Sequence, residues 1–249
     1  MKKFLLFFSV FVSLFAYGDV PRAQLLWPIV DFGCNVPTAN SLGGNANASG
    51  ATVALTSVNV PARSLIVVGI TEIQPSSNGS VADSAGNSYT LIKQAYVNGN
   101  SGLGNIQLFY AYNVLPLSGG SITYTKATSG DATSISALFA SCIQTTPSPL
   151  DAAVTASATA SSSTPSVTSG TPGQAGELFV GFLGWNGTGT FTQDSTNAAW
   201  ASTLTFENSS SASGGGGSVV NSGTGTLKYA PTMGTSHYNA IIIAGFKHH

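Results

Sequence analysis

Three aromatic residues close together in the sequence offer the clearest opportunity for ligand binding. Trp185, Phe191 and Trp200 border a segment rich in Gly, Thr and Asn, with Asn186 and Asp194 beside them. A sugar stacks its CH groups on a flat aromatic ring while its hydroxyls bind amides and carboxylates. These five residues therefore predict a weak polysaccharide-binding surface. The alternative is that both tryptophans belong to the core, because the apolar alternation that ends at Trp185 points this side chain toward one face.

Four acidic side chains could in principle supply the carboxyl pair of a glycoside hydrolase, but no two are spaced to lie on one face of one strand. They are Glu72, Glu177, Asp194 and Glu207. His237 is the only histidine away from the end of the sequence, and neither a G-x-S-x-G nor an H-E-x-x-H motif occurs. We therefore expect no enzymatic activity and no cofactor, and we keep a glycoside hydrolase as an alternative.

A short polar segment, Asp83-Ser84-Ala85-Gly86-Asn87, could bind Ca²⁺ through Asp83, Asn87 and backbone carbonyls. The same residues are typical of a hairpin turn, in which Asp83 binds its own backbone and Gly86 or Asn87 takes a positive φ. One carboxylate is little for a Ca²⁺ site. The turn is therefore the favoured interpretation, and no metal is predicted.

The start of the sequence has the pattern of a signal peptide. Two lysines precede the apolar stretch 4–16, and Ala16 and Gly18 are the small residues that a signal peptidase reads. The pattern predicts a signal peptide at 1–18 and a single domain at 19–249, secreted and free of the membrane after cleavage. The alternative is an uncleaved anchor, for which the stretch is short because a bilayer needs about 20 apolar residues.

Export makes the two cysteines interpretable. Cys34 and Cys142 are the only cysteines, and an isolated pair in an oxidising compartment is expected to form a disulfide. Such a bridge would constrain the unfolded chain by about 4–5 kcal/mol on the chain-entropy model. The alternative is two buried free thiols.

Composition and periodicity indicate an all-β protein. Of the 249 residues only 7% are charged, and eight Lys and Arg residues offer no basic stripe for nucleic acid. Apolar runs with a period of two recur between turn residues and predict about eleven strands in a single antiparallel β-sandwich, of jelly-roll or immunoglobulin-like type. The segments 145–173 and 209–218 are predicted to be loops, because they are rich in Pro, Ser and Thr or contain four consecutive glycines. The predicted strands are 25–32, 52–60, 64–73, 88–97, 106–114, 121–126, 133–143, 177–185, 204–206, 225–229 and 238–246.

Five motifs in order resemble a group of secreted and phage-associated bacterial β-sandwich proteins with the signature V-x-D-S-x-G-N-x-Y. The motifs are Val81–Tyr89, Leu108–Tyr112, Ser148–Asp151, Gly176–Gly181 and Ala240–Lys247. The resemblance implies a secreted β-sandwich and no established activity. A Glu that often precedes the S-P-L-D motif in this group is absent from the strand around Leu138, so no role of that Glu is transferred.

Together these observations predict a secreted, non-enzymatic surface or binding module that recognises a neutral polysaccharide or a cell surface through exposed aromatic rings. A structural envelope or virion-associated protein is the first alternative, and it predicts buried tryptophans. A glycoside hydrolase is the second, and it predicts two carboxyls about 5–10 Å apart in a cleft.

Overall fold

The computed structural model describes residue 34 and residues 36–47, 49–73, 78–97, 104–127, 132–208 and 211–249. Residues 33–249 form one compact unit. The described part of the chain contains seventeen strands and no helix, and every paired strand is antiparallel, so the all-β prediction is confirmed. No helix long and apolar enough to span a membrane occurs among the described residues. The predicted signal peptide and the predicted strand at 25–32 lie outside them.

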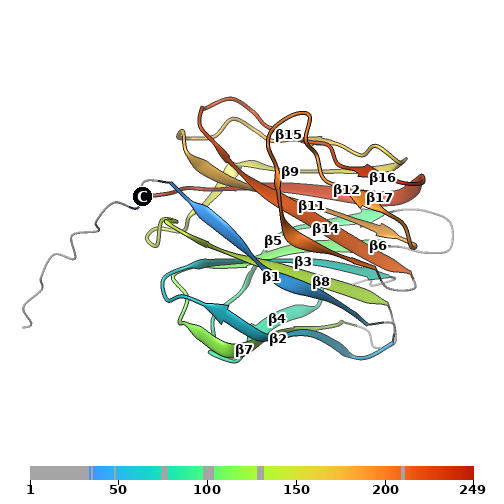
Figure 1. Cartoon of the computed structure of the whole chain (residues 1–249), viewed down its shortest axis with the longest axis horizontal. Helices are drawn as coiled ribbons and strands as arrows, with labels where there is room; N and C mark the ends of the chain where they lie inside the picture. Colours follow the sequence, from blue (N-terminus) through green and yellow to red (C-terminus); the bar gives the residue numbers. More distant parts are fainter. Residues whose placement is uncertain are drawn as a thin grey trace, which may run out of the picture. The chain divides into compact units, whose positions relative to one another are not determined.

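Thirteen of the strands form three stacked sheets (Figure 1). The middle sheet has the order β1 (Thr38–Asn47), β8 (Thr133–Ser141), β3 (Leu65–Ile73), β6 (Gly104–Ala111) and β5 (Thr90–Val97). A small sheet covers one face and consists of β2 (Thr52–Val60), β7 (Leu117–Thr125) and β4 (Ser80–Asp83). The large sheet covers the other face and has the order β13 (Ala201–Asn208), β14 (Ala212–Asn221), β11 (Glu177–Asn186), β17 (His237–Phe246) and β9 (Leu150–Ser162).

The middle sheet is buried on both faces, which explains why its central strands are apolar in almost every position. Val67 and Leu138 point toward the large sheet and share a core with Phe182, whereas Val68 and Ile135 point toward the small sheet. Alternation along a strand divides such a run between two cores. The first core lies between the middle and large sheets, and the second lies between the middle and small sheets.

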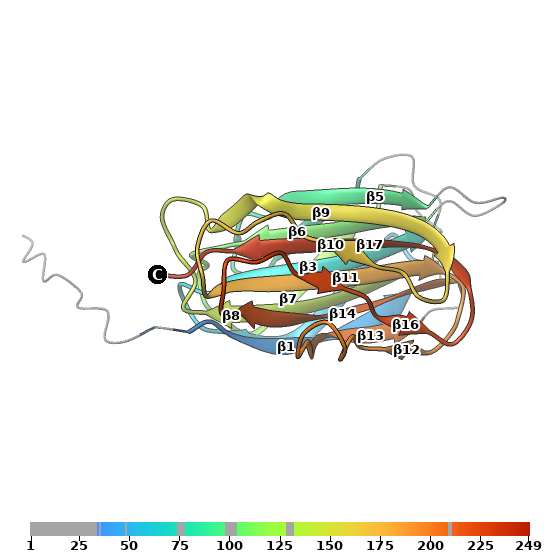
Figure 2. The ribbon, with the colours of Figure 1, turned by 90° about the horizontal axis from the view of Figure 1, so that it is seen from above.

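A third core covers the outer face of the large sheet. Two short strand pairs lie over this face, and the segment that joins β11 to β13 runs beside them. The pairs are β10 (Val167–Thr168) with β15 (Lys228–Tyr229), and β12 (Phe191–Thr192) with β16 (Thr232–Met233). Figure 2 shows the large sheet beneath them, with β9 along one edge and β13 along the other. This third core buries Trp185, Trp200 and Tyr229.

The glycine run predicted as a surface loop is a buried strand, so that prediction is wrong. Gly214–Gly217 occupy the middle of β14, paired with β11 on one side and β13 on the other. A Cβ on Gly214 would lie 2.9 Å from the ring of Phe182, and a Cβ on Gly215 would lie 3.1 Å from Cβ of Phe206. Atoms of neighbouring strands thus occupy the space that side chains at Gly214 and Gly215 would need.

The segment 145–173 also departs from the prediction of a loop. It contains β10 and the thirteen-residue edge strand β9, although Thr146-Pro147 is a cis peptide bond just ahead of them. Ala, Ser and Thr dominate β9, and their weak hydrophobic contrast concealed its alternation from the sequence. The remaining strands absent from the prediction are β1, β4, β12, β14 and β16.

The predicted disulfide is confirmed. Cys34 and Cys142 are bonded, with 5.1 Å between their Cα atoms. Cys142 directly follows β8, and Thr38 at the start of β1 pairs with Ser141 at the end of β8. The bridge therefore fastens the chain ahead of β1, an edge strand, to a central strand of the middle sheet.

Candidate functional site

The two tryptophans of the predicted sugar-binding surface are buried. Trp185 ends the alternation along β11 on the outer face of the large sheet, and its exposed fraction is 0%. Its ring stacks on Phe206 at a centroid distance of 5.3 Å, and Phe206 stacks on Phe191 at 5.7 Å. Because other protein rings cover these faces, Trp185 offers no stacking surface to a sugar. Phe191 and Asn186 are half-buried.

Trp200 and Asp194 also serve the third core. The exposed fraction of Trp200 is 6%; its ring packs on Tyr229 at 4.6 Å, and its Nε1 donates to the carbonyl of Lys228 at 3.2 Å. The carboxylate of Asp194 accepts hydrogen bonds from the backbone N–H of Thr196 at 2.9 Å and of Ala230 at 2.8 Å. The two residues therefore fasten the segment after β12 onto β15 and its neighbours, and neither faces solvent.

Acid should weaken the hydrogen bonds that the Asp194 carboxylate accepts. Burial alone would raise the pKa of Asp194, but hydrogen bonds from Thr196, Asn197 and Ala230 outweigh it and lower the pKa. A lowered folded-state pKa contributes stability above about pH 4 that is lost as the pH falls through the folded-state value. We expect Asp194→Asn to lose about 2 kcal/mol at pH 6, within the range for hydrogen bonds to charged groups. Urea unfolding at pH 6 and pH 3 tests this: the gap between variant and wild type should shrink at pH 3, and a constant gap contradicts it.

The segment considered for Ca²⁺ forms a turn. Asp83 accepts hydrogen bonds from the backbone N–H groups of Ala85 and Asn87, both at 3.0 Å, from Asn87 Nδ2 at 2.8 Å and from the Tyr89 hydroxyl at 2.9 Å. Both carboxylate oxygens are therefore engaged by donors of the chain itself. Gly86 has a φ of +78°, the conformation expected for this turn.

Chelation should leave this turn intact. We expect the melting temperature to be unchanged by a chelator, because protein donors already satisfy Asp83. Gly86→Val should lower stability by about 1 kcal/mol or more, since a β-branched residue disfavours a positive φ. Calorimetric melts with and without chelator measure both, and a clear drop with chelator would contradict the turn interpretation.

Glu72 and Glu207, two of the four acids considered for catalysis, lie in different parts of the fold. Glu72 is fully buried between the middle and small sheets, where it accepts a 2.5 Å hydrogen bond from the Tyr124 hydroxyl. Gln107 Nε2 donates to the same hydroxyl at 2.7 Å. Burial and the Glu72 hydrogen bond raise the pKa of Tyr124. Glu207 is half-buried under β1, and burial raises its pKa. Sequence reasoning missed Gln107, which stands in no motif. The alternation around Tyr124 favours a core or sheet-surface position, and Tyr124 is buried.

The structure brings one carboxyl pair together, and it joins two of the motifs that carry the family resemblance. Asp151 at the start of β9 and Glu177 at the start of β11 flank the end of β17 on the outer face of the large sheet. Their exposed fractions are 5% and 0%. Asp151 Oδ1 accepts from the N–H of Ala153 and Oδ2 from that of Gly173, both at 3.0 Å. Gln174 N donates to Glu177 Oε1 at 3.3 Å.

The two carboxyls of this pair influence each other's ionisation. Burial, the charge of Asp151 and a hydrogen bond between the two carboxyls raise the pKa of Glu177 to about 7. Burial acts against ionisation of Asp151 as well, but the N–H groups of Gly173 and Ala153 outweigh it and lower its pKa. At neutral pH Asp151 is thus ionised while Glu177 retains much of its proton. A glycosidase holds a sugar and water between its two carboxyls in an open cleft, whereas Asp151 and Glu177 are both buried.

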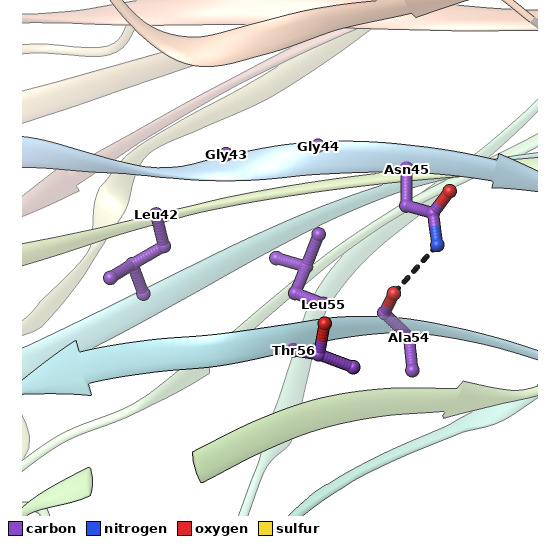
Figure 3. A pocket seen from close by; sticks show the side chains of 7 residues that line it. All are labelled: Leu42, Gly43, Gly44, Asn45, Ala54, Leu55 and Thr56. Carbon is purple, nitrogen blue, oxygen red and sulfur yellow. Dashed lines mark hydrogen bonds between the residues drawn. The ribbon is translucent and has the colours of Figure 1, made fainter. Parts of the chain in front are cut away.

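Two surface grooves among the described residues are shallow. One lies between β1 and β2, is about 190 Å³ in volume, and is lined by Leu42, Gly43, Gly44, Asn45, Ala54, Leu55 and Thr56 (Figure 3). Asn45 Nδ2 donates to the carbonyl of Ala54 at 2.7 Å across it. Ligand pockets are typically 300–1,000 Å³ and bring several polar groups together. This groove is smaller and has no charged residue in its lining.

Comparisons with protein-family models, with curated proteins and with solved structures find no match to this chain. The resemblance to secreted and phage-associated β-sandwich proteins therefore stays a prediction.

Proposed function

We propose that the protein is a secreted, non-enzymatic structural module of an extracellular assembly, such as an envelope or a virion surface. The observation that supports this most is the burial of Trp185 and Trp200, because the rings that would have bound a ligand hold the third layer of the fold together. The middle and large sheets are the sandwich of jelly-roll or immunoglobulin-like type in this proposal, and the small sheet is an addition to it.

Two further features support a structural role. The disulfide fastens the chain ahead of β1, and an oxidising compartment outside the cell preserves such a bond. The only close carboxyl pair found among the described residues is buried and hydrogen-bonded, as expected of a group that stabilises a fold. A sequence with 7% charged residues also suits a surface that packs against other subunits, because few charges must lose their hydration on contact.

Fractionation of the native source tests this function. An antibody against the protein should detect it outside the cell, sedimenting with envelope or particle material, and salt should release little of it. Free monomer in the medium would contradict a structural role. As a matched measurement, purified protein is applied to insoluble neutral glycans. We expect that the glycans retain none of it.

Polysaccharide binding stays a second proposal, supported by the partial exposure of Phe191 and Asn186 and by Tyr238, whose exposed fraction is 42%. One ring stacked on a sugar contributes on the order of 1 kcal/mol, so the affinity would be millimolar or weaker. Retention on a glycan that is lost in Phe191→Ala, with the melting temperature kept, would move this function to first place.

A further inference from the structure

Three side chains with complementary chemistry lie on one face at one end of the large sheet. Asp151 pairs with Gly245 in the β9–β17 ladder, and the β11–β17 ladder ends with Leu178 opposite Phe246. Continuing that register places Lys247 opposite Glu177, and the backbone N–H of Lys247 donates to the carbonyl of Pro149 at 2.8 Å. Lys247 therefore lies beside Glu177 and diagonally across from Asp151, which is the spacing at which long side chains on a sheet meet.

The side chains of Asp151, Glu177 and Lys247 all reach the neighbourhood of Gly173. A methyl group placed on Gly173 would lie 3.2 Å from Asp151 Oδ2, 3.8 Å from Lys247 Cε and 4.0 Å from Glu177 Oε1. The charge of Lys247 lowers the pKa of both carboxyls, in keeping with this proximity. Lys247 is half-buried, whereas Lys93 and Lys228 are exposed.

We propose that Lys247 and Asp151 become joined by an amide bond between Nζ and Cγ, with Glu177 as the group that transfers the protons. The site is a self-modification site, so it needs no ligand, metal or partner. The proposal goes beyond the structural function given above and does not depend on it.

The reaction is a condensation that needs no oxidant or other reactant. Glu177 donates its proton to an oxygen of Asp151 and takes one from the Lys247 ammonium, which frees the amine to attack Cγ. The tetrahedral intermediate then passes a proton from nitrogen through Glu177 to the same oxygen, which leaves as water. Ammonium and carboxylate have become amide and water, and Glu177 ends protonated as it began.

Three features of this site favour the reaction. The N–H groups of Ala153 and Gly173 each hold one oxygen of Asp151, so they are placed to stabilise the negative charge of the tetrahedral intermediate. Fixed positions on adjacent strands replace a bimolecular encounter. Burial of both carboxyls limits the access of water, which would otherwise favour hydrolysis of the amide.

The bond would fasten the edge strand β9 to β17 close to the disulfide. Ile143, which follows Cys142, forms an isolated bridge with His248, and Gln144 N donates to the carbonyl of Lys247 at 3.0 Å. Two covalent links would then close the same end of the fold, one in the middle sheet and one in the large sheet. That arrangement suits a module that must resist unfolding outside the cell.

Mass spectrometry of the purified full-length secreted protein tests the bond. The N-terminus of the purified protein is determined first, and the mass expected from the sequence is calculated from that residue. After reduction and denaturation the measured mass should be lower than this expected mass by one water. Digestion should yield a branched peptide that joins the segments around Asp151 and Lys247. Two separate linear peptides at full mass would overturn the proposal. So would two linear peptides of which the one containing Asp151 has lost water, because that loss indicates a succinimide at Asp151 and no link to Lys247.

Variants assign the roles. Lys247→Arg keeps the positive charge but cannot form the amide, and Glu177→Gln removes the proton transfer, so both should show the full mass. Lys228→Arg, a change at an exposed lysine, should keep the deficit of one water. Loss of the branched peptide in Lys228→Arg, or its persistence in Lys247→Arg, would assign the link to other residues. If a variant fails to fold, the map of the wild-type peptides still decides the matter.

Discussion

Gly216→Ala should disturb the native packing of the large sheet. We expect the free energy of unfolding to fall by about 3 kcal/mol or more, at the upper end of the range for overpacking. A Cβ at this position would collide with the carbonyl oxygen of Gly181 in the adjacent strand β11 and would lie 3.1 Å from Cα of Phe182. Both contacts are to backbone, so no side-chain rotation can relieve them. Urea unfolding followed by tryptophan fluorescence measures the loss.

Gly225→Ala is the matched control. This glycine lies in an exposed turn, and a Cβ there would have no atom within 4 Å. We expect its stability to stay within about 0.5 kcal/mol of wild type, as for most surface substitutions. Equal effects of the two substitutions would show that β14 tolerates a side chain and that the packing described for it is mistaken.

Removal of the disulfide is expected to have the second large effect. The bond closes a loop between residues 108 apart in the sequence, so its loss should lower stability by about 4–5 kcal/mol on the chain-entropy model. Both cysteines are half-buried, and Ser at either position therefore creates only a small packing defect. Denaturant unfolding of Cys34→Ser, and of wild type with and without reductant, provides the measurement.

The comparison between variant and reduced wild type separates the cross-link from side-chain packing. Both should unfold at the same lowered denaturant concentration, because each lacks the same constraint on the unfolded chain. A midpoint that reduction leaves unchanged, in protein shown by alkylation to carry two free thiols, would contradict a stabilising role of the bridge.

The sequence alone predicted the strands that have strong hydrophobic contrast. The run 52–60 coincides with β2, and 177–185 differs from β11 by one residue. Sequence reasoning failed for strands whose residues are determined by packing against neighbouring strands. Glycines in β14 have no periodicity of their own, and they are required because atoms of neighbouring strands leave no room for a Cβ. Small residues in β9 likewise gain their place only through pairing with β17.

The carboxyl pair was beyond sequence reasoning for a related reason. Asp151 and Glu177 begin two strands that do not pair with each other, and they meet only because β17 lies between β9 and β11. That order depends on long-range pairing that local patterns do not encode. A usable signal existed, since both residues stand in motifs of the noted resemblance, but their spacing in the sequence did not indicate that they lie together.

The sequence likewise did not decide whether Trp185 and Trp200 belong to the core or to the surface, because the alternation along β11 does not reveal that a third layer covers its outer face.

The equilibrium stability of Trp200→Ala tests most directly whether these aromatic residues are structural rather than ligand-binding. The indole packs on Tyr229 and is almost fully buried, so its loss should lower the free energy of unfolding by about 3–5 kcal/mol. We expect that loss in denaturant unfolding, with no retention of either wild type or variant on insoluble glycans. Unchanged stability together with glycan retention that only the wild type shows would contradict a structural role of Trp200.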